Sequence, residues 1–338
     1  MTYDGLDDAY DRLRSTGPEF DGWLSNHGPM AAEALARHGH EGEIPAWLDG
    51  YCRRLEAAPG PSRRIDDWRT ALGDPQRLGD WLGWFEEQLR DSPWTSVLHT
   101  WWPRLLPGIA AGATHGVIRV GHAVRVLRDE GETPARVAEL AQGLGYWAAR
   151  WQPVPGAASP GGPLGAEAAV AAVPSIPSQV GGIVPRLAQL EHLDGWAQAQ
   201  RAIAPSVDWE GFLRDVVSAA VRRYATHAHG DPVMLVHAAT APNAVLRVLP
   251  SLPHEHWAAS AAGAWSASAA IHAVYTPATG VPPPTTPATA ADAFDRATQH
   301  GDEHVIKLAD TALDTYSWTA DDLALAAVER AALLIDPA

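Results

Sequence analysis

The feature that most constrains the fold is a spacing of apolar residues that recurs along the chain. Stretches such as LDDAYDRL (6–13) and LGDWLGWFEEQL (78–89) place apolar residues at i, i+3, i+4 and i+7, the period of one helix face. Only the short run VMLVH has a strand-like composition, and helix-forming residues flank it. The pattern predicts an all-α protein with helices at 6–13, 29–39, 44–58, 78–89, 94–130, 133–152, 207–228, 231–252, 254–275, 302–315 and 319–335. Within 94–130, Pro and Gly predict a break, with a second helix starting near Pro107.

Two long segments interrupt the helical pattern. Residues 153–185 are rich in Pro, Gly and Ala, and residues 276–289 are rich in Pro and Thr. Loops of this length in a compact protein are usually lids, binding loops or linkers. We therefore expect one large multi-helix domain over 1–338 with two loops that could act as lids. An α-solenoid is the competing all-α architecture.

Composition excludes several classes of partner. Apolar residues make up 46% of the chain and charged residues 19%, which is typical of a globular protein. The net charge of −15 argues against binding to nucleic acid or to an anionic membrane. The single cysteine, Cys52, and the acidic N-terminus without an apolar run favour a cytoplasmic location. No run of about 18 apolar residues predicts a membrane span.

The familiar cofactor motifs are absent from the sequence. No G-x-G-x-x-G follows a strand, so NADPH has no recognisable binding motif, and no P-loop, H-E-x-x-H, C-x-x-C or G-x-S-x-G occurs. What remains is a set of 15 histidines, several of them inside apolar helical stretches. His115 and His122 lie seven residues apart, about 10.5 Å along one helix face, so at most one of them would bind a given metal. For these two and for His237, a hydrogen-bonded structural histidine is the competing interpretation, and for His27 it is a loop histidine at a helix start.

Lys307 is the only lysine among 25 basic residues. A helical wheel places it with Glu303, Asp310 and Asp314 on a polar arc, which indicates a solvated lysine paired with Glu303. The alternative is a buried amine. Burial can lower the pKa of an amine enough to make it neutral, whereas a guanidinium stays charged. Such an amine can act as a base, form a Schiff base, or add carbon dioxide to become a carbamate.

Five short motifs carry a resemblance to a known family. In chain order they are NHGPMAAEAL, THGVIRVGH, YWAARWQ, VHAATAPNA and DEHVIKLADTAL. Their series, from about Trp23 to about Leu313, resembles the questin oxidase-like proteins. That family oxygenates anthraquinones and related aromatic polyketides by Baeyer–Villiger-type oxygen insertion or ring cleavage. Some members are similar to non-haem iron enzymes with several histidines and a carboxylated lysine, which implies as metal ligands His27, His115, His237, His304 and Lys307.

One position departs from the family pattern. Fungal relatives show H-P-L-I-H-L-G, whereas HGVIRVG here has Arg119 in place of the second histidine, and His122 lies one turn further on. The resemblance therefore implies two alternatives. In the first, iron is held with a changed ligand set. In the second, no metal is used: a base such as His115 or His237 deprotonates the substrate, and Arg119 stabilises the developing peroxy anion. Aromatic residues that could stack on a flat substrate, or simply pack in the core, are Trp101, Trp102, Tyr146, Trp147 and Trp151.

We therefore expect an oxidoreductase that acts on an aromatic polyketide with dioxygen, as a monooxygenase or dioxygenase. The expected partners are those two small molecules, without nucleic acid or membrane, and a homodimer is an open expectation. The competing function is a non-catalytic helical protein that binds a hydrophobic metabolite. A hydrolase with a carbamylated lysine is a third interpretation, but it would usually need the strands of a TIM barrel.

Overall fold

The structure is a computed structural model that describes residues 4–338, and its regular elements are almost all helices. Within that range it has 17 α-helices and one two-stranded antiparallel hairpin, formed by β1 (Glu19–Phe20) and β2 (Leu24–Ser25). The all-α fold class predicted from the apolar spacing is therefore confirmed.

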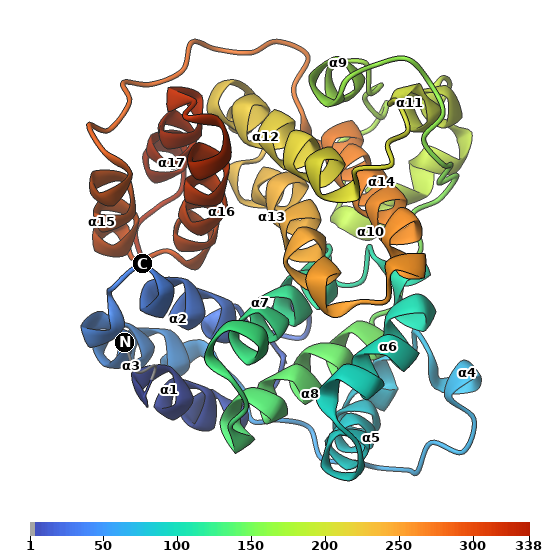
Figure 1. The fold of residues 1–338 in the computed structure, drawn as a ribbon, viewed down its shortest axis with the longest axis vertical. Coiled ribbons are helices and arrows are strands. Elements are labelled where there is room, and N and C mark those ends of the chain that lie inside the picture. The colour runs from blue at the N-terminus through green and yellow to red at the C-terminus, as the bar shows by residue number, and fades with distance from the viewer. Residues whose placement is uncertain (1–3) are drawn as a thin grey trace. The chain divides into compact units, whose positions relative to one another are not determined.

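The chain gathers into two compact units, each described by itself; Figure 1 labels their helices. Unit 1 comprises the residues up to Pro153 together with Arg247–His254, and unit 2 comprises Val154–Leu246 and Glu255–Ala338. The helices of unit 1 are α1 (Asp4–Arg14), α2 (Gly28–Arg37), α3 (Ile44–Tyr51), α4 (Trp68–Ala71), α5 (Leu78–Asp91), α6 (Trp94–Leu105), α7 (His115–Glu130) and α8 (Pro134–Ala149). Those of unit 2 are α9 (Ala166–Ala171), α10 (Ile183–Ala188), α11 (Trp196–Ala202), α12 (Trp209–His227), α13 (Pro232–Val248), α14 (Trp257–Tyr275), α15 (Ala290–His300), α16 (Glu303–Thr319) and α17 (Asp322–Leu334). The expectation of one domain over 1–338 stays a prediction.

Helix starts follow the local capping chemistry. The Thr133 side chain accepts a hydrogen bond from the backbone N–H of Arg136 and is followed by Pro134, as the sequence predicts for α8. Asp302 caps α16 in the same way, by accepting from the N–H groups of His304 and Val305. These caps satisfy donors that have no partner inside the helix.

Several segments differ from the sequence prediction. Helix α7 begins at His115 and not near Pro107, because the residues before it adopt left-handed backbone conformations. Helix α9 forms inside the expected loop 153–185, and α10 begins there. The helices α4, α11 and α15 lie in stretches for which the apolar spacing predicted no helix. Residues 276–289 contain no helix or strand, as expected, and Val281 N–H donates to the carbonyl of Thr226 at 2.8 Å.

Helix α8 lies at the centre of unit 1, where it packs against α1, α5 and α7. The contact with α7 is close, because a Cβ placed on Gly116 would lie 2.8 Å from the Cβ of Trp147. The indole N–H of Trp147 donates to the carbonyl of Gly108 at 3.0 Å, which ties α8 to the segment that leads into α7. In unit 2, α12 packs against α9, α14, α16 and α17.

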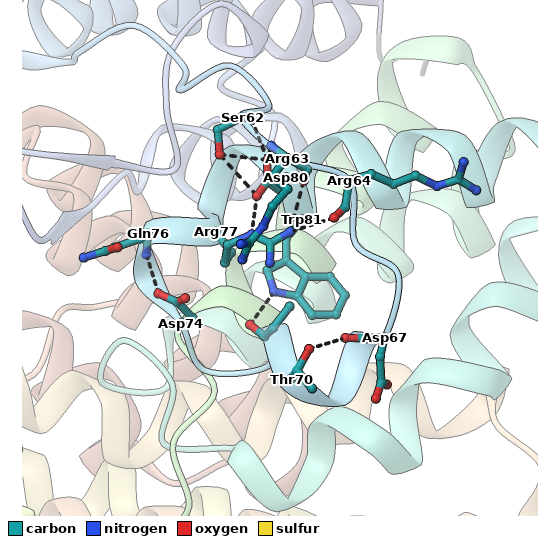
Figure 2. Close-up of polar contacts among 11 residues, drawn as sticks. Ser62, Arg63, Arg64, Asp67, Thr70, Asp74, Gln76, Arg77, Asp80 and Trp81 are labelled. Carbon is teal, nitrogen blue, oxygen red and sulfur yellow. Dashed lines mark hydrogen bonds and ion pairs between the residues drawn. The ribbon is translucent and has the colours of Figure 1, made fainter.

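The coil before α4 is tied to α5 through one buried carboxylate, Asp80 (Figure 2). Asp80 accepts from the backbone N–H groups of Ser62 and Arg63, at 2.5 and 2.8 Å, and from the guanidinium of Arg77. Burial alone would raise the pKa of Asp80, but these donors together hold it below its ordinary value. The segment 62–64 is thereby fixed without regular secondary structure.

One stretch of the described chain, Pro232–Ser251, is long and apolar enough to cross a membrane by composition. However, 83% of its most apolar window is buried inside the fold. Burial of that kind is typical of a core helix, so this stretch is weak support for a membrane span.

We expect opposite effects from alanine at two helical glycines of unit 1. Gly116→Ala should lower the free energy of unfolding by about 1–3 kcal/mol, because the methyl group would collide with Trp147. Gly83→Ala, in α5, should raise the free energy of unfolding by up to about 1 kcal/mol. The added methyl group would meet its nearest neighbour at an ordinary contact distance of 3.9 Å, and alanine favours helix. Urea denaturation of both variants measures the difference, and equal shifts would contradict the close α7–α8 contact.

Candidate functional site

Unit 1 brings His27 and His115 together as a buried pair. Their Nε2 atoms lie 2.7 Å apart, and the ring planes meet at 78° with centroids 4.5 Å apart. His27 immediately precedes α2, and His115 is the first residue of α7. Both side chains are buried, so the two imidazoles meet away from bulk water.

The surrounding contacts fix how the two rings present their nitrogens. The Nδ1–H of His115 donates to the carbonyl of Gly112, which leaves the lone pair on Nε2 directed at His27. The backbone of His27 is held because its N–H donates to the hydroxyl of Tyr51 at 2.6 Å. Next to it, the Asn26 side chain accepts from the N–H of Gly28 at 2.9 Å.

This pair fits two ligands of a first-row transition metal. Imidazole nitrogens bind such metals at about 2.1 Å, so two of them at roughly a right angle lie about 3 Å apart. The observed separation of 2.7 Å is close to that value. Without a metal, the same geometry is a hydrogen bond in which His27 Nε2–H donates to His115.

The segment before His115 is strained. Gly112, Ala113 and Thr114 have φ angles of 53°, 58° and 71°, three consecutive residues in the left-handed region. Only the first is glycine, and it also admits the Tyr146 hydroxyl, which a side chain at 112 would strike. The Thr114 hydroxyl is buried, and within residues 4–338 it has no hydrogen-bond partner.

Arg119 lies one turn after His115 on α7 and is bound by Glu139 of α8. Its Nε and Nη2 donate to the two carboxylate oxygens at 2.6 and 2.7 Å. Burial opposes the charge of Arg119, but Glu139 outweighs it and raises the pKa of the guanidinium. Arg119 therefore stays a cation and cannot bind a metal. Its third nitrogen, Nη1, has no acceptor among the described residues.

His122 has no nitrogen left for a metal. Its Nδ1 donates to Glu33 at 2.7 Å, and its Nε2 accepts from Arg247 at 3.2 Å. Burial lowers the pKa of His122 to about 4, although Glu33 opposes that change. Glu33 also binds Arg125, so His122 belongs to a buried ion-pair network and not to the histidine pair.

Unit 2 brings together His237 of α13 and His304 of α16, whose ring centroids lie 6.1 Å apart. His237 is fully buried, and its Nδ1–H donates to the carbonyl of Met234 at 3.1 Å. The Nδ1 of His304 lies 3.3 Å from the carboxylate of Asp302. In both residues Nε2 is therefore the nitrogen that carries the lone pair.

Lys307, one turn after His304, is fully buried. Its Nζ has no hydrogen-bond partner in the described part of the chain. Burial lowers the pKa of the amine to about 7, while Glu303 and Asp302 oppose that shift. The polar arc of the helical wheel is thus not solvated, because Glu303, Asp310 and Asp314 are buried as well.

The candidate aromatic residues all lie in unit 1, and four of them are buried in its core. Trp101 packs edge-on against Trp81 and Phe85, and Trp102 against Trp147. The Tyr146 hydroxyl lies 2.5 Å from that of Ser25, and Trp151 packs against Gly108. These contacts are those of a packed interior, and no substrate is needed to explain them.

Sequence reasoning missed three groups that surround His115 and Arg119 in unit 1. They are the Gly112 carbonyl, the Thr114 hydroxyl and the Glu139 carboxylate. The only available signals were the small residues of AAGATHG before His115 and a lone acid inside the apolar run of α8. Neither signal identifies the residue that is contacted. The Glu139 carboxylate lies on a different helix from Arg119, and the positions of the Gly112 carbonyl and the Thr114 hydroxyl depend on the backbone conformation before His115.

Replacing Lys307 by methionine should stabilise the protein in a pH-dependent way. The pKa of the amine falls from 10.5 in its ordinary setting to about 7 in the folded chain, so the unfolded chain binds the extra proton between these values. The increase in the free energy of unfolding that Lys307→Met causes should therefore grow as pH falls from about 10 to 7. Below pH 7 it should level off at a few kcal/mol. Chemical denaturation from pH 6 to 10 measures it.

Leu308→Met is the matched control on the same buried helix, because it changes shape without adding or removing a titrating group. Its stability difference should not vary with pH. A flat profile for Lys307→Met as well would mean that the amine is not desolvated in the folded protein.

No protein-family model matches this chain, and no curated protein matches it. The resemblance to the questin oxidase-like proteins therefore rests on the five short motifs and their order, and the function that it implies is taken up as a proposal.

Proposed function

We propose that the protein is an oxygenase of aromatic polyketides, such as anthraquinones and their reduced forms, with the buried His27–His115 pair as its centre. The observation that carries the proposal is the 2.7 Å separation of two Nε2 atoms in a buried setting, with the His115 tautomer fixed by the Gly112 carbonyl. The outcome is Baeyer–Villiger-type oxygen insertion or ring cleavage.

The donor set fits a non-haem iron ion, because imidazole suits iron as well as zinc and copper. Iron would supply the one-electron chemistry that lets dioxygen react with a closed-shell ring. The chain's own part is to hold the ion through His27 and His115 and to present a fixed cation one turn away. Arg119 serves that second role, since Glu139 orients it and its Nη1 has a donor to spare.

A mechanism without a metal uses the same residues differently. An electron-rich hydroquinone anion can reduce dioxygen itself, provided that a base removes its proton and a cation stabilises the negative charge that develops. His115 is the base in that scheme, because the Gly112 carbonyl holds its proton on Nδ1 and leaves Nε2 as the basic nitrogen, and Arg119 is the cation. His237 is the second candidate base, from unit 2.

A non-catalytic binding protein is the competing function. Buried polar atoms without partners weigh against it, because they cost stability and a passive scaffold gains nothing from them. Within residues 4–338 they include Arg119 Nη1, Thr114 Oγ1 and Lys307 Nζ.

The first experiment combines metal analysis with oxygen uptake. Purified protein should contain about one equivalent of iron and consume dioxygen with at least one member of a panel of anthraquinones and their hydroquinones. His27→Ala and His115→Ala should each lower the iron content at least about tenfold, because each removes one ligand. His229→Ala, at an exposed histidine of unit 2, is the control and should retain both.

The outcomes separate the alternatives. Oxygen uptake without iron supports the metal-free mechanism. Binding of the panel without uptake favours the non-catalytic function, and neither binding nor uptake overturns the proposal.

We further propose that the Lys307 amine reacts with carbon dioxide, forming a carbamate and releasing one proton, as the resemblance implies. A neutral amine is the reactive form, and a pKa of about 7 makes it abundant at neutral pH. With ¹³C-labelled bicarbonate, wild-type protein should show a carbamate NMR signal that Lys307→Arg lacks. The variant should also lose oxygen uptake, because a guanidinium keeps the positive charge but does not form the carbamate. Unchanged uptake in Lys307→Arg would mean that Lys307 has no part in the oxygenase reaction.

A further inference from the structure

A small, largely enclosed cavity lies inside unit 2, at side chains of the helices that Figure 1 labels α12, α13 and α14. The space between its atoms is about 150 Å³, well below the roughly 300–1,000 Å³ of pockets for organic ligands. A cavity of this size suits one ion or one water molecule. Three basic side chains line it and no acidic one does; the lining residues are Ala220, Arg223, Tyr224, His227, Leu235, His272 and Thr276.

His272, from α14, has a nitrogen without a partner at this cavity. The residue is 3% exposed, and its Nε2 has no hydrogen-bond partner within residues 4–338. Its Nδ1 lies 2.9 Å from the hydroxyl of Thr276. Burial lowers the pKa of His272 to about 3, so the ring is neutral and carries a single proton. A hydrogen bond from the Thr276 hydroxyl to Nδ1 places that proton on Nε2, which is then a buried donor without an acceptor.

Arg223, from α12, adds a positive charge that no acid neutralises. It is half-buried, and in the described part of the chain its Nε has no hydrogen-bond partner. Burial lowers the pKa of the guanidinium, and no carboxylate opposes that shift. The buried Arg119 of unit 1, by contrast, is neutralised by Glu139. A desolvated cation without a counter-ion is destabilising, and a bound anion removes that cost.

We infer that this cavity binds one small monovalent anion, of the size of chloride, between the guanidinium of Arg223 and the imidazole of His272. The anion accepts from Arg223 Nε–H and from His272 Nε2–H, and its charge offsets that of Arg223. Because the two donors come from α12 and α14, the bound anion also links these helices. The Tyr224 hydroxyl takes no part, since it donates to the carbonyl of Pro232 at 2.8 Å.

His227 belongs to the wall of the cavity and is not a donor to the anion. Its Nδ1–H donates to the hydroxyl of Thr226 at 2.7 Å, and that hydroxyl donates to the carbonyl of Arg223 at 3.2 Å. The ring also lies against Gly280, where an added Cβ would come within 2.6 Å of it. His227 thus separates the cavity from the segment 276–289.

A transition-metal ion is the competing occupant, because two imidazoles line the cavity. The charge of Arg223 opposes a second cation, and the lining contains no carboxylate or thiolate that would offset it. The charge balance of the lining therefore favours an anion.

The chloride dependence of stability tests the inference in the full-length protein. Sodium gluconate replaces sodium chloride at constant ionic strength, and urea denaturation gives the folding equilibrium constant. In wild type this constant should rise about tenfold for each tenfold increase in chloride above its Kd, because only the folded chain forms the site. Arg223→Met and His272→Phe each remove one donor and should weaken chloride binding at least about tenfold.

Arg222→Met is the matched control, because it removes the same charge from the adjacent position of α12. The Arg222 guanidinium binds Asp321 at 2.5 Å and does not line the cavity, so this variant should keep the chloride dependence of the wild type. Crystals grown with sodium bromide should show an anomalous peak between Arg223 and His272. A wild type without a chloride effect, or an equal effect in wild type, Arg223→Met and His272→Phe, overturns the inference. Zinc binding that His272→Phe abolishes, in a protein insensitive to chloride, overturns it in favour of a metal.

Discussion

The packing of α7 on α8 sets most of what unit 1 can offer chemically. Gly116 lets Trp147 approach the α7 backbone, and Arg119 joins the same two helices through both oxygens of Glu139. Both contacts fall within the first two turns of α7, so they fix the position of its first residue, His115. A helix end usually frays, but a buried ion pair and a packed indole hold this one in place.

The buried polar groups divide into two kinds. His122 is saturated, since Glu33 and Arg247 take up both of its ring nitrogens, and burial keeps it neutral. Thr114 and Lys307 keep polar atoms without partners in the described chain, although each unmet hydrogen bond costs about 1–3 kcal/mol. The same low-dielectric interior therefore makes some side chains structural and others chemically available. The distinction follows from their partners and not from the residue type.

Local pattern predicted most of the long helices and missed α4, α9, α10, α11 and α15. It succeeds where it does because apolar spacing and capping residues act within a few positions of the chain. The site depended on contacts that no local pattern contains. His27 and His115 are 88 residues apart, and only the family resemblance placed both among the ligands. The helical wheel of α16 indicated a solvated Lys307, because a wheel describes one helix and not what covers it. Likewise the late start of α7 depends on left-handed Ala113 and Thr114, residues that give no sequence signal of that conformation.

The backbone before His115 argues that this segment is not shaped by stability alone. A residue with a Cβ in the left-handed region costs about 1–2 kcal/mol, which glycine would avoid. Gly112 avoids that cost, yet Thr114, the most positive φ of the three, carries a branched side chain with a hydroxyl that bonds to nothing in the described chain. A glycine at 114 would relieve the strain and remove the unmet donor together. The threonine is thus destabilising on two counts, so the stability of the folded chain does not by itself explain why this residue precedes α7.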